Sequence, residues 1–113
     1  MLTIYHNPRC AKSRETLQLI NDEGKDVEVV EYLKHPPTEE ELREILAKLN
    51  LPIDYLIRKN EAIYKSEFKD QDLSEDQLIA ALVKYPQLME RPIVIKDGQA
   101  ILGRPPENVK KFF

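Results

Sequence analysis

The residue whose type and position point most clearly to chemistry is Cys10, the only cysteine in a chain of 113 residues. It follows Asn7-Pro8, a turn signal, and precedes a segment with the pattern of a helix, so we predict the thiol at or near the helix N-cap. Free backbone N–H groups and the positive end of the helix dipole favour a thiolate there, and cysteine pKa values at such positions fall to roughly 3.5–7.5. Arg9 and Lys12 add positive charge. We therefore predict an activated nucleophile.

Two neighbouring side chains bear on the chemistry of this thiol. His6 lies four residues before Cys10, where it could lower the thiol pKa as a cation or move a proton. The alternative is that His6 is a partly exposed residue at the end of a strand, without a role in the chemistry. Ser13 can offer its hydroxyl to the thiolate or to a bound oxygen. A lone cysteine is more often buried and inert, but the polar and basic flanks argue against that here. Without a second cysteine, any redox cycle must use an outside thiol.

A predicted hairpin supplies a second candidate group. Asp97-Gly98 is a strong signal for a two-residue hairpin loop, and such a loop places Arg91 directly opposite Arg104 if the register holds to the open end. Their Cβ atoms would then lie about 4.5–5.5 Å apart, and like charges in that position are destabilising.

An anion bound between the two guanidinium groups would explain why they are held so close together. Guanidinium forks match the oxygens of carboxylate and phosphate-like anions. The alternative is that Arg91 and Arg104 point into solvent or pair with acids such as Glu90 or Glu107, as surface arginines usually do. Arg58 has no special pattern of its own, and its periodicity indicates a surface residue.

Composition and motifs argue against several classes of protein. With 17 Lys+Arg, 20 Asp+Glu and a net charge of -3, the chain lacks the electrostatic footprint of nucleic-acid binding. It has no glycine-rich phosphate loop, and Thr16 stands where a phosphatase loop needs an arginine six residues after its cysteine. The acidic run Glu39–Glu41 fits a helix N-terminus rather than a metal site. We expect no metal and no bound cofactor.

The expected location is the cytoplasm. No apolar run approaches the ~20 residues that a membrane span needs, and the first ten residues do not have the pattern of a signal peptide. A single cysteine suits a reducing compartment. The length predicts one domain over residues 1–113.

The elements around these residues define an α/β fold. The expected order is a strand over 2–5, a helix over 10–22 ended by Gly24, a strand over 27–33, a helix after the capping-box residue Thr38, a helical turn over 55–58, a helix after the capping-box residue Ser74, strands over 93–95 and 100–102, and a last helix over 107–112. A β-α-β start implies parallel strands with a right-handed crossover, and the hairpin is antiparallel. We predict a four-stranded mixed sheet with flanking helices and an inserted helical segment, the outline of a thioredoxin-like domain.

Short stretches along nearly the whole chain resemble the glutaredoxin-coupled arsenate reductases, a thioredoxin-like family. In order, they are Ile4–Pro8 with Cys10 and Ser13-Arg14, Tyr32-Leu33 with Pro36-Pro37, Leu56–Asn60, Asp76–Ile79, Arg91–Val94, and Leu102–Pro105. Each stretch is weak alone, but the ordered set is specific.

The resemblance implies a role for each matching residue. Cys10 matches the nucleophile, His6 the histidine that assists it, and Pro92 the cis-proline beside it. The arginines that would hold the oxyanion are Arg58, Arg91 and Arg104. The hairpin pattern reaches two of these arginines independently, whereas Arg58 depends on the resemblance alone.

The implied reaction is the reduction of arsenate to arsenite through a covalent adduct on Cys10. Glutathione would be the co-substrate and a glutaredoxin the protein partner, with no nucleic acid or membrane involved, and we expect a monomer. One alternative is a thiol-transfer protein that acts on glutathione conjugates. Another is a regulator of the Spx type, which binds RNA polymerase; those usually carry a C-x-x-C switch, and Ser13 argues against one here.

Overall fold

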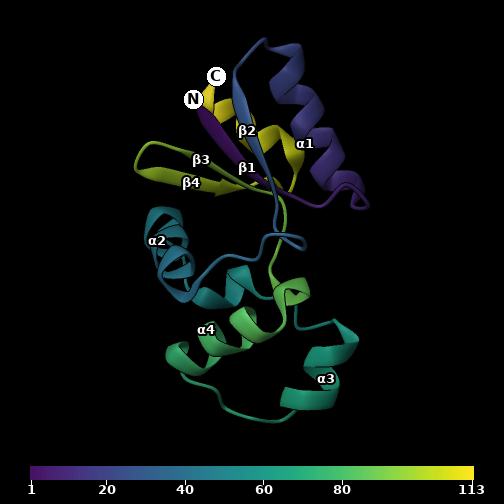
Figure 1. Ribbon diagram of the computed structural model, residues 1–113, viewed down its shortest axis with the longest axis vertical. Helices are drawn as coiled ribbons and strands as arrows, with labels where there is room; N and C mark the ends of the chain where they lie inside the picture. The colour runs from purple at the N-terminus through teal and green to yellow at the C-terminus, as the bar shows by residue number, and fades with distance from the viewer. The chain divides into compact units, whose positions relative to one another are not determined.

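A computed structural model describes all residues, 1–113. The chain forms two compact units. The first unit comprises Met1–His35 and Arg91–Phe113, and the second comprises Pro36–Glu90. Figure 1 shows their elements in the order of the sequence. The second unit is the helical segment that was expected between the two halves of the sheet, and the expectation of a single domain over 1–113 stays a prediction.

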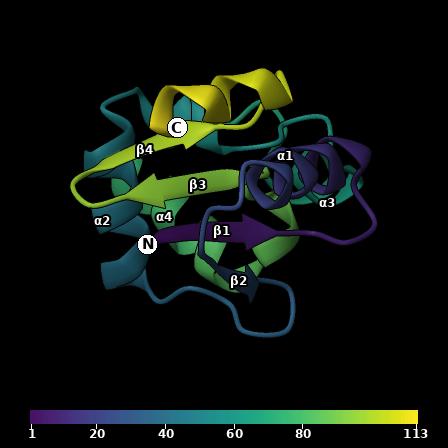
Figure 2. The same ribbon diagram turned by 90° about the horizontal axis from the view of Figure 1, so that it is seen from above.

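A four-stranded mixed sheet forms the first unit. Its strands are β1 (Leu2–His6), β2 (Val27–Glu31), β3 (Ile93–Lys96) and β4 (Gln99–Leu102). The order is β2-β1-β3-β4, which can be followed in Figure 2. β1 pairs with β2 in parallel, and β3 runs antiparallel to both β1 and β4. The predicted fold class is therefore confirmed.

Helix α1 (Ala11–Asp22) joins β1 to β2 and ends where the sequence predicts, because Gly24 takes a φ of 72 just beyond it. The last predicted helix is instead a 3-10 helix, η3 (Pro106–Phe112). Its buried residues are spaced by three, which suits three residues per turn: Pro106, Val109 and Phe112. One hydrophobic cluster joins β1, α1, β3 and η3, formed by Leu2, Ile4, Ile20, Val94, Val109 and Phe112.

Strand β2 is two residues shorter than predicted. The expected strand over 27–33 ends at Glu31, because the N–H groups of Lys34 and His35 both donate to the Glu31 carbonyl, at 3.0 Å each, and fold the chain into a turn. The hairpin register, by contrast, is the predicted one. Ile93 lies opposite Leu102 on the neighbouring strand.

The second unit is helical and contains α2 (Glu39–Leu49), α3 (Ala62–Phe68), α4 (Glu75–Lys84), and the 3-10 turns η1 (Ile53–Leu56) and η2 (Pro86–Leu88). Both predicted capping boxes are present, Thr38 with Glu41 and Ser74 with Gln77. Each box satisfies two backbone N–H groups at the start of its helix. The predicted turn over 55–58 is η1, shifted two residues toward the N-terminus.

Helix α3 was not predicted. It has no side-chain cap and buries none of its residues, so it carries neither a start signal nor an apolar stripe. Its ring contacts are those of Phe68, with Tyr64 at 5.7 Å and with Tyr85 at 6.1 Å between centroids. The contact of Phe68 with Tyr85 joins residues that are far apart in the sequence and leaves no local pattern.

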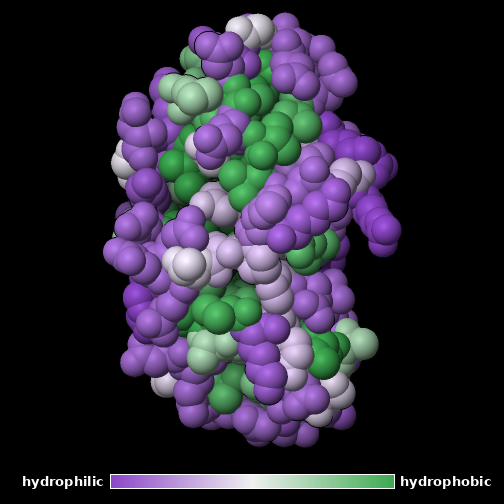
Figure 3. All heavy atoms as spheres, in the orientation of Figure 1, coloured by the Kyte–Doolittle hydropathy of each residue, from purple (hydrophilic) through white to green (hydrophobic).

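The face shown in Figure 3 is mostly hydrophilic, with hydrophobic residues visible between the hydrophilic ones. None of the helices combines the length and the apolar character that crossing a membrane requires.

Candidate active site

The segment between β1 and α1 places Cys10 as predicted. The N–H groups of Arg9 and Cys10 donate to the side-chain and backbone oxygens of Asn7, each at 3.0 Å, and these bonds form the turn. Cys10 is the N-cap of α1, with φ -95 and ψ 123, and its carbonyl accepts the N–H of Arg14 at 3.0 Å. The thiol therefore stands at the first turn of the helix and is partly exposed.

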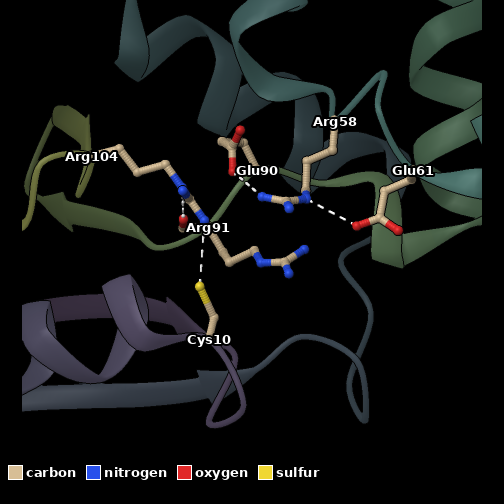
Figure 4. A network of polar contacts seen from close by, with 6 residues as sticks. All are labelled: Cys10, Arg58, Glu61, Glu90, Arg91 and Arg104. Carbon is tan, nitrogen blue, oxygen red and sulfur yellow. Dashed lines mark hydrogen bonds and ion pairs between the residues drawn. The ribbon is translucent and has the colours of Figure 1, made fainter.

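The surroundings of Cys10 favour the thiolate. Burial alone would raise the pKa of the thiol, but hydrogen bonds from the Ser13 backbone N–H and the Arg91 side chain, and the charges of Arg91 and Arg104, lower it further than burial raises it. Arg104 Nη2 lies 3.4 Å from Cys10 Sγ, as Figure 4 shows. The net pKa is below the ordinary value. Neither Arg9 nor Lys12, which the sequence suggested as contributors, is among the groups that lower the pKa of Cys10.

The hairpin brings Arg91 and Arg104 together. The Gly103 N–H donates to the Pro92 carbonyl at 2.9 Å, which continues the predicted register beyond the strands. Arg104 Nε then donates to the Arg91 carbonyl at 2.8 Å. Both arginines are half-buried beside the sulfur, so the alternative in which they point into solvent is wrong. The Arg91-Pro92 bond is cis, as the resemblance implies, and the Arg104-Pro105 bond is cis as well.

Helix α1 and the end of the hairpin approach each other closely at Gly103. A Cβ atom on Gly103 would lie 2.6 Å from Pro92 Cγ and 2.6 Å from Thr16 Oγ1. The fully buried Thr16 donates its hydroxyl proton to the Lys12 carbonyl at 2.8 Å, and its oxygen is 3.5 Å from the Gly103 carbonyl oxygen. Only glycine fits this contact, which lies one residue from Arg104. The packing roles of Gly103 and Thr16 were not predicted from the sequence.

His6 and Ser13 form a buried pair. His6 is 6% exposed, so the alternative of a partly exposed strand-end residue is wrong, and its Nδ1 lies 2.6 Å from the Ser13 hydroxyl. That hydroxyl oxygen accepts the Asn7 N–H at 3.0 Å. Which of the two groups donates in the His6–Ser13 hydrogen bond depends on the tautomer of the imidazole, because a hydroxyl that accepts one N–H can still donate or accept a second bond. Ser13 contacts the sulfur with its backbone N–H, whereas its hydroxyl bonds to His6 and Asn7. The predicted contact of this hydroxyl with the thiolate is therefore wrong, and its contact with a bound oxygen stays a prediction.

The charge state of His6 follows from its burial. Burial lowers the pKa of His6; the charge of Glu31 raises it and that of Arg14 lowers it, and the net direction is downward. The imidazole is therefore neutral at neutral pH, which disfavours the predicted role of a cation that activates Cys10. A role for His6 in proton movement stays a prediction.

Arg58 lies in the second unit and pairs with two carboxylates. Arg58 Nη1 is 2.8 Å from Glu90 Oε1, and Arg58 Nε is 3.1 Å from Glu61 Oε1 (Figure 4). Backbone bonds fix this neighbourhood, because the Arg58 N–H donates to the Leu88 carbonyl and the Glu90 N–H to that of Leu56. Burial would lower the pKa of Arg58, but the two carboxylates raise it more. It is thus not the surface residue its periodicity indicated, and its oxyanion role stays a prediction.

The arrangement in the first unit has a clear chemical capacity. A partly exposed thiol with a lowered pKa, next to guanidinium groups, can provide a nucleophile together with a binding site for a small oxyanion. No group of three or more His, Cys, Asp or Glu side chains is placed to hold a metal ion.

Comparison with known proteins assigns the chain to a family. The model of the ArsC family matches residues 5–112. This chain belongs to the ArsC family. The match includes every residue described above for the first unit's site, from His6 to Arg104.

Several relatives are similar to this ArsC-family chain over most of their length. The protein YfgD of Escherichia coli (strain K12) is 50% identical over 108 residues, which cover 94% of this chain and 91% of that protein. An arsenate reductase of Neisseria meningitidis serogroup B is 42% identical over 111 residues, covering 96% and 95%. The solved structure of an arsenate reductase from Vibrio cholerae has a TM-score of 0.94 at 44% identity, covering 99% of this chain and 97% of that one.

We expect Arg104→Ala to raise the pKa of Cys10, because it removes an opposite charge in contact with the sulfur. The measurement is the pH dependence of the alkylation rate of the thiol. Lys12→Ala is the control: it removes a positive charge from the same helix that does not contact the sulfur, and should leave the pKa unchanged. An unchanged pKa in Arg104→Ala would contradict the assigned contact.

We expect Gly103→Ala to lower the free energy of unfolding by about 1–3 kcal/mol, as overpacking does, and also to raise the pKa of Cys10. The new Cβ must push α1 and the hairpin end apart, which moves Arg104 from the sulfur. Gly98→Ala in the same hairpin is the matched control, because nothing lies within 4 Å of a Cβ there. Chemical denaturation and thiol alkylation give the two readouts, and equal behaviour of the two variants would refute the close contact.

Proposed function

We propose that this ArsC-family protein reduces arsenate to arsenite with glutathione and a glutaredoxin. The observation that carries the proposal is the Cys10 sulfur, whose pKa is lowered by donors and charges of Ser13, Arg91 and Arg104. Two of the three side chains expected to hold the oxyanion therefore already lie at the nucleophile. The name of the Neisseria relative supports arsenate as the substrate.

The guanidinium groups reduce the electrostatic repulsion between the thiolate and an anionic substrate. An anionic sulfur that approaches an anionic substrate is repelled, by about 4 kcal/mol for two unit charges about 4 Å apart at an effective dielectric constant near 20. That repulsion alone would slow attack roughly a thousandfold. Arg91 and Arg104 are fixed beside Cys10 before the substrate arrives, so they offset the repulsion without reorganisation.

The reaction that we propose has four steps. The Cys10 thiolate attacks arsenic, and one oxygen leaves as water. Glutathione displaces a second oxygen, and a glutaredoxin thiolate then attacks the glutathione sulfur. The electron pair of the sulfur–arsenic bond stays on arsenic, which passes from As(V) to As(III), while a glutaredoxin–glutathione disulfide forms. Water finally releases arsenite from Cys10.

External thiols are required because the chain has a single cysteine and carries Ser13 three residues after it. The cytoplasm supplies such thiols in reduced form, and we place the reaction there. We expect the protein to act as a monomer and to need no bound cofactor.

The direct test is arsenate-dependent NADPH oxidation with glutathione, glutaredoxin and glutathione reductase. We expect turnover by the wild type, none by Cys10→Ser, and a loss of at least about tenfold in Arg91→Ala, because removal of one oxyanion donor costs that much or more. Arg91→Lys keeps the positive charge but loses the planar guanidinium fork, so its turnover should lie between that of the wild type and that of Arg91→Ala.

Two results would change the assignment. If arsenate gives no turnover but Cys10 still forms a mixed disulfide with glutathione, the protein is a thiol-transfer protein of the same fold. If the chain retains RNA polymerase in a pull-down and does neither reaction, it is a regulator of the Spx type.

The oxyanion role of Arg58 needs its own test. We expect Arg58→Ala to raise the KM for arsenate about tenfold, since a charge-assisted hydrogen bond contributes about 1.5–3 kcal/mol. Lys59→Ala is the control: it removes a neighbouring positive charge that pairs with Asp54 at 2.8 Å. Equal KM values for the two variants would remove Arg58 from the site.

A further inference from the structure

A cavity of about 260 Å³ lies in the first unit, next to the segment that contains His6 and Asn7. One wall is the segment 6–9, which leads from β1 to Cys10, and the other consists of Glu31, Leu33 and Lys34, at and after the end of β2. β1 and β2 are parallel, so both walls belong to the carboxyl ends of adjacent strands. Ligands of open α/β sheets bind outside these ends.

The cavity carries a net positive charge and an apolar wall. Arg9 and Lys34 supply two cations and Glu31 one carboxylate. Lys34 Nζ lies 3.5 Å from Glu31 Oε1, with 72% and 38% of the two side chains exposed, and such surface pairs are weak. A ligand carboxylate can therefore compete for Lys34. Leu33, 47% exposed, offers apolar surface at the same place.

The reductant of the proposed reaction matches this combination. Glutathione is a tripeptide whose glycyl end bears one carboxylate, whereas its γ-glutamyl end bears a carboxylate and an ammonium group that cancel. A cavity with one excess positive charge selects the glycyl end. The volume is below the about 300–1,000 Å³ of sites that enclose a drug-sized ligand, which suits one end of a tripeptide with the rest outside.

The reach of the tripeptide agrees with this placement. Arg9 precedes Cys10 directly, so their Cα atoms are about 3.8 Å apart. The cysteinyl-glycine part of glutathione spans about 7 Å when extended. With the glycyl carboxylate between Arg9 and Lys34, the thiol can extend to the sulfur or to an adduct on Cys10.

We propose that this cavity binds the glycyl end of glutathione, with Arg9 and Lys34 holding the carboxylate and Leu33 packing against the peptide. The inference rests on the proposed function for the identity of the reductant. It adds the place where the reductant binds and the part of the molecule that is recognised.

The test uses the whole protein and no arsenate. Cys10 is converted to its mixed disulfide with 2-thiopyridine, a neutral leaving group. A glutathione thiolate attacks the Cys10 sulfur, forms the Cys10–glutathione disulfide, and releases 2-thiopyridine with the electron pair of the broken bond, which is followed by absorbance. The reaction is compared for glutathione and for glutathione amidated at the glycyl carboxylate.

We expect the wild type to react about two- to fivefold faster with glutathione than with the amide, the range of one or two surface charge contacts. Lys34→Ala and Arg9→Ala should lose this preference, and Lys12→Ala, which removes a cation that does not line the cavity, should keep it. No preference in the wild type, or an equal loss in Lys12→Ala, would overturn the proposal.

Failure of this inference and failure of the proposed function give different results. A preference for glutathione that depends on Lys34, without arsenate turnover, would retain the cavity and refute the reductase. Arsenate turnover without that preference would retain the reductase and refute the cavity. In the coupled assay, we expect Lys34→Ala to raise the KM for glutathione and to leave that for arsenate unchanged.

Discussion

The site depends on keeping a negative charge on a partly buried sulfur. Burial raises the pKa of Cys10, and the Ser13 N–H together with Arg91 and Arg104 reverses that effect. Each pH unit corresponds to about 1.4 kcal/mol between thiol and thiolate, which is comparable with a single charged hydrogen bond. The loss of one of these contacts therefore lowers the fraction of thiolate.

Sheet topology brings these distant residues together. β3 is antiparallel to β1, and Tyr5 near the end of β1 lies opposite Ile93 at the start of β3. The residues just before β3 therefore emerge beside those just after β1, which places Arg91 next to the approach to Cys10. The hairpin then returns Arg104 to the same edge. A central β1 with the nucleophile after it, and a hairpin with an arginine at each open end, are sufficient to form the site.

What the sequence could predict is local. Both capping boxes, the end of α1 at Gly24, the N-cap position of Cys10 and the hairpin register follow from residues a few positions apart, and the structure has them all. The register even leads to the meeting of Arg91 and Arg104, because one turn fixes every later pair.

What the sequence could not predict depends on contacts across the chain. Gly103 has no conformational signature of its own, since its importance comes from Thr16 and Pro92 on two other segments. Glu90, one of the two carboxylates that pair with Arg58, is brought to it by a backbone bridge between Ile57 and Met89. The burial of His6 likewise depends on tertiary packing around the folded sheet. This burial lowers the pKa of the imidazole.

Arg91 and Arg104 have two roles in the proposed reaction, one toward the sulfur and one toward the substrate. They hold the thiolate before the substrate arrives, and the proposed reaction also asks them to hold the oxyanion. A guanidinium group has five donors in a rigid fork, so Arg104 can keep Nε on the Arg91 carbonyl while its Nη groups pass from sulfur to substrate oxygen. The new bond to arsenic removes negative charge from the sulfur, so the sulfur no longer needs the guanidinium N–H donors. These donors then lie close to the arsenate oxygens, where the negative charge remains. The Ser13 N–H belongs to the backbone of α1 and stays in place throughout, which keeps the sulfur oriented while the side chains move.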